Sequence, residues 1–133
     1  MTTSAQWTPA SVIDLAKSFD RFTDQWAPKR IATVNDYDVR IAKLQGEFVW
    51  HTHPDTDEFF LVIDGRLTIL LRSPDTDQVP EVTLGPGQIF VVPRGIEHCP
   101  TAVGETKVLM FEPTGTPNTG DAGGDRIREP ENL

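Results

Sequence analysis

The chain has 133 residues, of which 38% are hydrophobic and 24% are charged, and its formal net charge at pH 7 is −8. This length suits one domain with a single core, and the composition excludes a disordered chain and a membrane-embedded one. The negative charge repels phosphate groups, so we expect neither nucleic acid nor an anionic membrane as a partner.

Cysteine use and the N-terminal sequence indicate a cytoplasmic protein. Cys99 is the single cysteine, so no internal disulfide can form, which is typical of a reducing compartment. The first residues, MTTSAQWTPA, lack the basic start and the apolar stretch of a signal peptide. No apolar run in the sequence approaches membrane-spanning length.

The N-terminal region carries the pattern of one amphipathic helix. Thr8 is a good N-cap, and Pro9 suits the first helical position. Apolar residues then recur at helical spacing, at Val12, Ile13, Leu15, Ala16, Phe19 and Phe22. The spacing predicts a helix over Pro9–Asp24, and Pro28 prevents its continuation.

The rest of the chain reads as short strands separated by turn signals. Asn35-Asp36 and Asp64-Gly65 are hairpin signals, and residues 73–80 form a polar loop. Many short strands at close spacing favour an all-β barrel or sandwich. The predicted strands are Ile31–Val34, Tyr37–Leu44, Glu47–His53, Glu58–Ile63, Leu67–Leu71, Val82–Leu84, Gln88–Val92 and Lys107–Phe111.

We therefore expect one domain with three parts. Residues 1–28 form a helical segment, and residues 29–112 form the β-barrel. Residues 113–133 are too poor in apolar side chains to make core. We expect this tail to be extended or partly disordered.

Three histidines and one glutamate stand at spacings that suit a metal site. His51 and His53 lie two positions apart on a predicted strand, so both imidazoles point to one face. A short loop returns the chain to Glu58, which opens the next predicted strand. Two nitrogen ligands and a carboxylate form a partial shell for Zn²⁺, Fe²⁺, Mn²⁺, Ni²⁺ or Cu²⁺. His98, the third histidine, follows the turn signal Pro93-Arg94-Gly95 and completes the candidate set.

Glycine and proline residues stand at fixed spacings from these candidate ligands in two blocks of the sequence. The first block runs Gly46, four residues, His51-Thr52-His53, four residues, Glu58, six residues, Gly65. The second runs Gly87, five residues, Pro93-Arg94-Gly95, two residues, His98. A lone His-x-His pair on a strand is usually solvated, but the full pattern is far more specific. The two blocks resemble the two signature motifs of the cupin superfamily.

This resemblance implies a fold, a cofactor and a ligand set. The fold is a double-stranded β-helix, or jelly roll, with the metal inside the barrel. The cofactor is a divalent transition metal, namely Fe, Mn, Ni or Zn. The implied metal ligands are His51, His53, Glu58 and His98.

The resemblance also extends beyond the two motifs and shows two departures. Trp26–Pro28 and Asn118–Asp121 are similar to small bacterial cupins of the mannose-6-phosphate isomerase-like group. Four residues separate Gly46 from His51, where the motif usually has five. Ala102 stands where the second motif commonly ends in asparagine. Neither departure touches a ligand.

Strand alternation predicts which side chains line the cavity. With the histidines inward, Glu47 and Phe60 also point inward, and Arg94 lies beside a ligand loop. We expect these three residues to contact a substrate, with Arg94 suited to an anionic group or else a solvated turn residue. We expect Cys99 to point away from the site and to be a small buried group. Outward residues include Phe48, Trp50, Phe59, Leu61 and Ile63.

Two functions remain open at this point. The first is a metalloenzyme that acts on a small oxygen-rich substrate, carboxylate or sugar-like, by Lewis-acid isomerase or lyase chemistry or by O₂-dependent dioxygenase chemistry. The second is a non-catalytic metal-binding, ligand-binding or sensor protein. No catalytic residue is assigned beyond the metal ligands. The apolar outer face predicts a homodimer, and the partner in either function is a small molecule.

Overall fold

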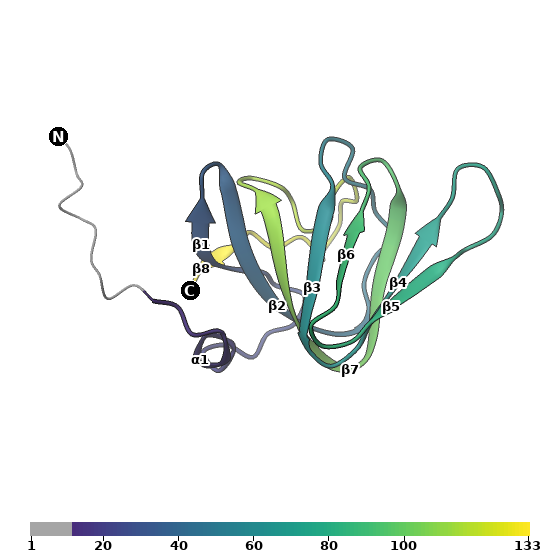
Figure 1. Ribbon diagram of the computed structural model, residues 1–133. Helices are drawn as coiled ribbons and strands as arrows, with labels where there is room; N and C mark the ends of the chain where they lie inside the picture. Colours follow the sequence, from purple (N-terminus) through teal and green to yellow (C-terminus); the bar gives the residue numbers. More distant parts are fainter. Residues whose placement is uncertain (1–11) are drawn as a thin grey trace.

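The computed structural model describes residues 12–133 (Figure 1). Its single described helix, α1, spans Leu15–Phe19 and is capped by Asp14, whose carboxylate accepts from the Lys17 amide at 3.0 Å. The predicted cap at Thr8 and Pro9 lies outside the described residues. Within residues 12–133, no helix is long and apolar enough to cross a membrane.

The predicted helix end at Asp24 is wrong, because α1 ends at Phe19. The backbone carbonyl of Phe22 accepts a hydrogen bond from the buried ammonium of Lys43 at 2.6 Å instead of one from a helical amide. Phe19 and Phe22 pack with Ile41 on the outer face of the sheet. A tertiary contact therefore replaces the last predicted turns of the helix.

The described strands curl into a barrel that is open at one side in Figure 1. They follow the order β5-β4-β7-β2-β1-β8, and β3 pairs with β6 and β7. The long β7 pairs with β2, β3 and β4, so it links these three strands into one sheet. The bounds are β1 Lys29–Val34, β2 Tyr37–Glu47, β3 Glu58–Asp64, β4 Leu67–Arg72, β5 Glu81–Leu84, β6 Ile89–Val92, β7 Glu97–Pro113 and β8 Glu131–Asn132. The all-β prediction with one N-terminal helix is confirmed.

Two strand predictions differ from the structure. The strand predicted over Glu47–His53 does not form: β2 ends at Glu47, and His51 makes only an isolated bridge to His98. The pairing of β2 with β7 shifts its register between Leu44 and Gly46, and Gly46 adopts φ of +81° just before this segment. β7 begins at Glu97, ten residues before the predicted Lys107–Phe111 strand.

Hairpins close where the turn signals predict them. Asn35 adopts φ of +55° between β1 and β2, and Gly65 adopts +93° between β3 and β4. A Cβ at Gly65 would lie 2.6 Å from Oγ1 of Thr106, which leaves no space for a side chain. Glycine is therefore required here by both backbone conformation and close packing.

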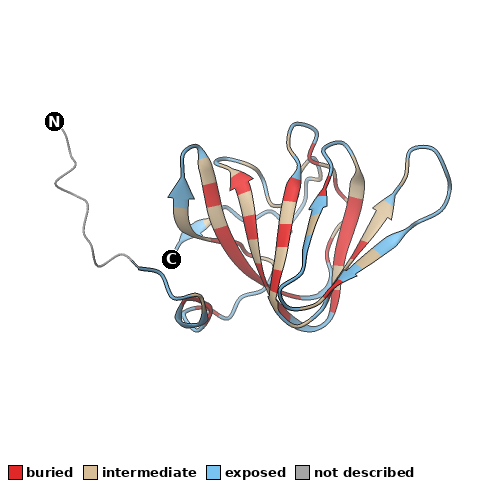
Figure 2. Cartoon of the chain, in the orientation of Figure 1, coloured by how far each residue is buried: buried red, intermediate tan, exposed pale blue. Residues whose placement is uncertain are grey.

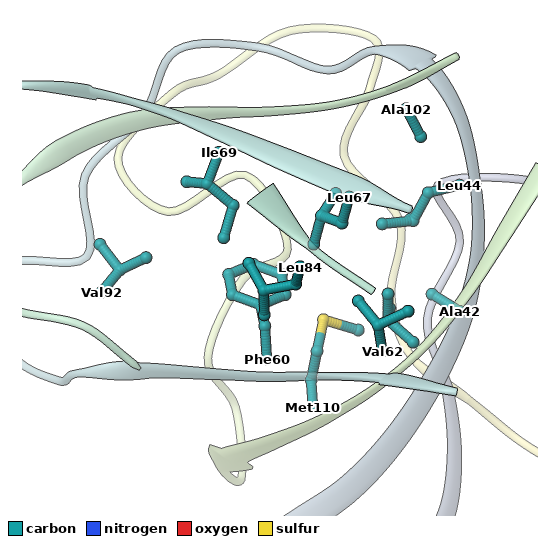
Figure 3. Packing of buried hydrophobic residues seen from close by; sticks show 11 residues of the cluster. Ala42, Leu44, Phe60, Val62, Leu67, Ile69, Leu84, Val92, Ala102 and Met110 are labelled. Carbon is teal, nitrogen blue, oxygen red and sulfur yellow. The ribbon is translucent and has the colours of Figure 1, made fainter. Parts of the chain in front are cut away.

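The core fills the inside of the barrel. Burial alternates along β3, where Phe60 and Val62 are buried and Phe59 and Leu61 are half-buried, as the alternation predicts (Figure 2). Figure 3 shows side chains from several strands directed into one space. The buried members of this cluster are Ala42, Leu44, Phe60, Val62, Leu67, Ile69, Leu84, Val92, Ala102, Val108 and Met110.

The C-terminal tail packs against the barrel. β8 pairs in parallel with β1, and Leu133 packs beside the cluster of Phe19 and Ile41. Thr119 is 1% exposed. The expectation of an extended or partly disordered tail misses these contacts, because they come from tertiary packing and not from apolar content.

Candidate metal centre

Three separate segments bring the four candidate ligands together. Glu58 is the first residue of β3, and His98 lies on β7. His51 is held beside His98 by two backbone hydrogen bonds of 3.0 and 2.9 Å, and His53 follows in the loop. All four side chains are buried, and one ligand atom from each lies within 4.8 Å of the others. The structure thus assembles the set that the sequence pattern predicts.

The backbone fixes which imidazole nitrogen faces the site. Nδ1 of His51 lies 2.8 Å from the carbonyl oxygen of Val49, and Nδ1 of His98 lies 3.0 Å from that of Ile96. Because a carbonyl only accepts, each Nδ1 carries a proton and donates it. Nε2 of each ring is then directed to the site, which is how protein imidazoles are oriented toward a metal.

Glu58 lies at the middle of the cluster. Its Oε1 is 2.7 Å from Nε2 of His98 and 4.0 Å from Nε2 of His51. Its Oε2 is 3.2 Å from Nε2 of His53, but the two atoms are not aligned for a hydrogen bond. The buried Nε2 of His53 thus finds no hydrogen-bond partner among residues 12–133. Three imidazoles, one carboxylate and an orphaned inward nitrogen are a donor set that fits a transition metal.

The charges in the cluster follow from its burial and its contacts. Burial lowers the pKa of His51 to about 4, so this imidazole is neutral at pH 7. Burial also opposes charge on Glu58 and His98, but their mutual contact outweighs it. The pKa of Glu58 is lowered well below its usual range by His53 and His98, and the pKa of His98 is raised by Glu58. Without metal, this contact favours the ionised forms of both groups.

A small cavity adjoins the cluster on the inside of the barrel. Its volume, counted as the space that the centre of a water molecule can occupy, is about 40 Å³. His51 and Glu58 reach it from the metal centre, and the remaining walls are mostly apolar. The other lining residues are Trp26, Pro28, Arg40, Ala42, Leu44, Phe48, Phe60, Pro100, Met110, Glu112 and Asn118.

Glu112 is a functional candidate that the sequence reasoning misses. It is 2% exposed and lines the cavity beside Glu58. Burial, and then the charge of Glu58, raises the pKa of Glu112 to about 10, so its carboxyl group is protonated at neutral pH. Glu112 follows the predicted strand Lys107–Phe111 at the inward parity of Met110, and this parity was a signal that could have found it.

Only one of the three predicted substrate contacts, Phe60, lies in the cavity. Phe60 lines the cavity, as predicted. Glu47 is exposed at the end of β2, because its parity along this strand is opposite to that of Ala42 and Leu44, which line the cavity. The Arg94 side chain is 63% exposed, and its Nε pairs with Asp57 at 3.2 Å on the surface. Glu47, predicted to point inward, is therefore not a cavity residue, and Arg94 fits the alternative of a solvated turn residue.

Two aromatic residues and the cysteine complete the surroundings. Phe48, predicted to point outward, is buried in the cavity wall, where it stacks on Trp26 at 4.6 Å and meets the ring of His51 edge-on at 5.5 Å. The reason is that Phe48 keeps the inward parity of Ala42 and Leu44 on β2, whereas the prediction counts the alternation back from His51. Cys99 is fully buried, and its Sγ lies near the carbonyl oxygen of Pro100 at 3.9 Å. Burial raises the pKa of this thiol to about 11, so it is uncharged.

Comparisons of sequence place the chain among cupins. The Cupin domain profile matches residues 38–112. The chain is 38% identical over 68 residues to the uncharacterised protein YdbB of Bacillus subtilis, a match that covers 51% of this chain and 56% of that protein. It is 33% identical over 98 residues to germin-like protein subfamily 1 member 5 of Arabidopsis thaliana, covering 69% and 44% respectively. The chain thus spans about half the length of these curated relatives.

Comparisons with solved structures also match this chain to a cupin. A cupin-2 domain containing protein from Shewanella frigidimarina is 42% identical, with a TM-score of 0.72, and the match covers 77% of this chain and 95% of that one. Hydroquinone 1,2-dioxygenase from Sphingomonas sp. TTNP3 is 20% identical, with a TM-score of 0.69. The match covers 87% of this chain and 36% of the dioxygenase chain. At this level of identity, the match shows a similar fold and nothing more. The profile match does not single out the mannose-6-phosphate isomerase-like group. By fold and by sequence, the chain belongs to the cupin family.

Proposed function

We propose that this chain binds a divalent transition metal through His51, His53, Glu58 and His98. The observation that carries the proposal is the clustering of four buried ligand atoms within 4.8 Å. The orphaned Nε2 of His53 supports it, because a buried nitrogen without a partner destabilises the fold unless another group satisfies it. Such a metal supplies Lewis-acid polarisation of a substrate oxygen, or electrons for chemistry with dioxygen.

We further propose that the cavity receives a small substrate with one oxygen-bearing group and an otherwise apolar body. Trp26, Phe48, Phe60 and Met110 form apolar walls that suit such a body more than a sugar. Arg40 is the cation at this cavity, but its guanidinium already donates to Asp38 and to the Thr116 carbonyl. A substrate oxygen is therefore oriented toward the ligand cluster and not toward a free cation.

Two carboxyl groups would act on such a substrate in different ways. Glu58 is ionised and faces the three imidazoles. Glu112 holds a proton, and its buried Oε2 is without a hydrogen-bond partner in the described part of the chain. Glu112 is thus placed to orient a substrate by hydrogen bonding within the cavity.

A non-catalytic binding protein is the second candidate. The cavity suits it as well, since about 40 Å³ of space for water centres holds about three or four water molecules and therefore a small ligand. Ligand binding without turnover is the property that separates this candidate from the enzyme.

Metal identification followed by a substrate screen tests the proposal. The purified chain is analysed for bound metals, reconstituted, and assayed with small phenolic, keto and carboxylic compounds for O₂ consumption and for isomerisation. Turnover by the wild type that is lost in Glu58→Gln supports the enzyme, whereas saturable binding without turnover supports the binding protein. Failure of every transition metal to bind contradicts the proposed metal centre.

A further inference from the structure

The segment that carries two of the metal-ligand candidates is held by the C-terminal tail. Thr52 lies between His51 and His53, outside any strand. Its amide donates to Oδ1 of Asp121 at 2.7 Å, and its carbonyl oxygen accepts from the Asp121 amide at 2.9 Å. One tail residue thus pairs both backbone groups of the residue between the two histidines.

Gly120 brings the tail backbone directly against the first histidine. It adopts φ of +55°. A Cβ at this position would overlap the carbonyl oxygen of Thr52 and would lie 3.0 Å from Cδ2 of His51. A side chain here would displace the histidine segment or the tail, so only glycine permits this approach.

The tail is itself fixed, so it can act as a support. Thr119 is buried, and the Asn118 side chain donates to the Arg126 carbonyl and accepts from the Arg128 amide, both at 3.0 Å. The Arg126 guanidinium lies 5.0 Å from the centre of the Phe48 ring, beside the cavity wall. The tail therefore closes on itself and on the barrel around Gly120.

We propose that Gly120 and Asp121 are positioning residues that set the placement of His51 and His53 in the metal centre. The proposal rests on the proposed function, because it concerns metal binding by these two histidines. On its other side the histidine segment is held by the His51–His98 bridge and by the Gly95 amide, which donates to the His53 carbonyl oxygen at 3.0 Å, so the tail supplies the backbone partners of Thr52 between them. Without the tail contacts, the two ring nitrogens lose the fixed spacing that a metal site requires.

The test compares glycine variants of the full chain. Gly120→Ala is matched with Gly115→Ala, because Gly115 also has a positive φ, +93°, but its Cβ would meet no described atom within 4 Å. Each variant is titrated with Co²⁺, read by ligand-field absorption and by chelator competition. We expect Gly120→Ala to raise the Kd for Co²⁺ about tenfold or more, the usual effect of losing support behind a metal ligand. Gly115→Ala should bind as the wild type does.

Asp121 variants keep the proposal testable if Gly120→Ala does not fold. Asp121→Asn keeps the Oδ1 acceptor for the Thr52 amide, whereas Asp121→Ala removes it. We expect weakened Co²⁺ binding and an altered Co²⁺ spectrum in Asp121→Ala, and restoration of both in Asp121→Asn. Unchanged Kd and spectrum in folded Gly120→Ala or Asp121→Ala overturns the proposal.

A measurement on metal-free protein separates this proposal from the proposed function. If the wild type binds no Co²⁺, the proposed function fails, and imidazole NMR resonances then report the placement of the rings. We expect the His51 and His53 resonances to shift in Gly120→Ala and Asp121→Ala and to stay in place in Gly115→Ala. Unshifted resonances in the first two variants overturn the positioning role.

Discussion

Glu58 and Glu112 are buried carboxyl groups that line one cavity, but Glu58 is ionised and Glu112 is neutral at pH 7. The imidazoles around Glu58 lower its pKa, whereas burial and the charge of Glu58 raise the pKa of Glu112 to about 10. Two adjacent carboxylates rarely both ionise without a compensating cation. Only Glu58 should therefore contribute a negative charge to metal binding.

Matched glutamine variants test this difference. Glu58→Gln removes a charged ligand, so we expect metal affinity to fall about tenfold or more. Glu112→Gln replaces a neutral carboxylic acid with a neutral amide of similar shape, so we expect metal affinity and Tm to change little. Chelator competition and thermal unfolding of both variants provide the measurement. A large loss of affinity in Glu112→Gln would show that Glu112 is ionised in the holoprotein.

His51 and His98 should make unequal contributions to the pH dependence of metal binding. A histidine must be neutral to bind metal through Nε2. The pKa of His51 is about 4, so it is already neutral at pH 6, whereas the raised pKa of His98 keeps that ring protonated. Affinity should fall as pH decreases through the pKa of His98, and fewer than three protons should be released per metal at pH 6. Calorimetry in buffers of different ionisation enthalpy counts them, and release of three would contradict these charge states.

At the scale of elements, the strands with regular alternation and marked turns were predictable. β3 and β4 flank Asp64-Gly65, and the predicted strands there differ from the observed ones by one residue at an end. The first half of β7 was not predicted, because Pro100 and Gly104 interrupt its β pattern, yet pairing with β2 and β4 keeps it extended. Local sequence decides the first case and tertiary pairing the second.

The same distinction explains what the sequence revealed of the site. The ligand set could be proposed from spacing because motif residues are fixed relative to strand ends. The predictions for Glu47 and Phe48 are wrong, because they count the alternation back from His51, whereas Phe48 keeps the inward parity of Ala42 and Leu44 on β2. The contacts of Gly120 with Thr52 join residues far apart in sequence, and no local pattern reports them.

The outer faces of β3 and β6 form an apolar stripe, defined as Phe59, Leu61, Ile89 and Val91. Phe59 pairs with Val91 and Leu61 with Ile89 across the two strands. Ile89 and Val91 are 56% and 44% exposed, and β6 pairs with β3 alone among the described strands. We propose that a second copy of the chain covers this stripe to form a homodimer, because an edge strand with apolar side chains favours self-association.

Light scattering with a matched pair of variants tests the dimer. Val91→Glu places a charge in the apolar stripe, so we expect this variant to be monomeric at micromolar concentration. Val103→Glu alters an equally apolar residue that is fully exposed outside the stripe, so it should remain a dimer like the wild type. A monomeric wild-type chain, or a dimeric Val91→Glu chain, counts against this interface.

For the whole molecule, metal binding and folding should be coupled. The ligands come from the His51–His53 loop, β3 and β7, so a bound metal links segments that separate on unfolding. Metal at a hundredfold excess over Kd adds ~2.7 kcal/mol to the free energy of unfolding. Removing it with a chelator should lower Tm by about 10 °C for a domain of this size. An unchanged Tm, in a sample first shown to contain metal, would mean that the site contributes nothing to stability.

Metal analysis of purified variants tests the central claim most directly. His53→Ala removes the ligand whose Nε2 is orphaned, whereas Cys99→Ser alters a buried residue beside His98 without changing the ligand set. We expect about one transition metal per chain in the wild type and in Cys99→Ser, and loss of most of it in His53→Ala. Full occupancy in folded His53→Ala, or loss of metal in folded Cys99→Ser, would show that the metal centre lies elsewhere.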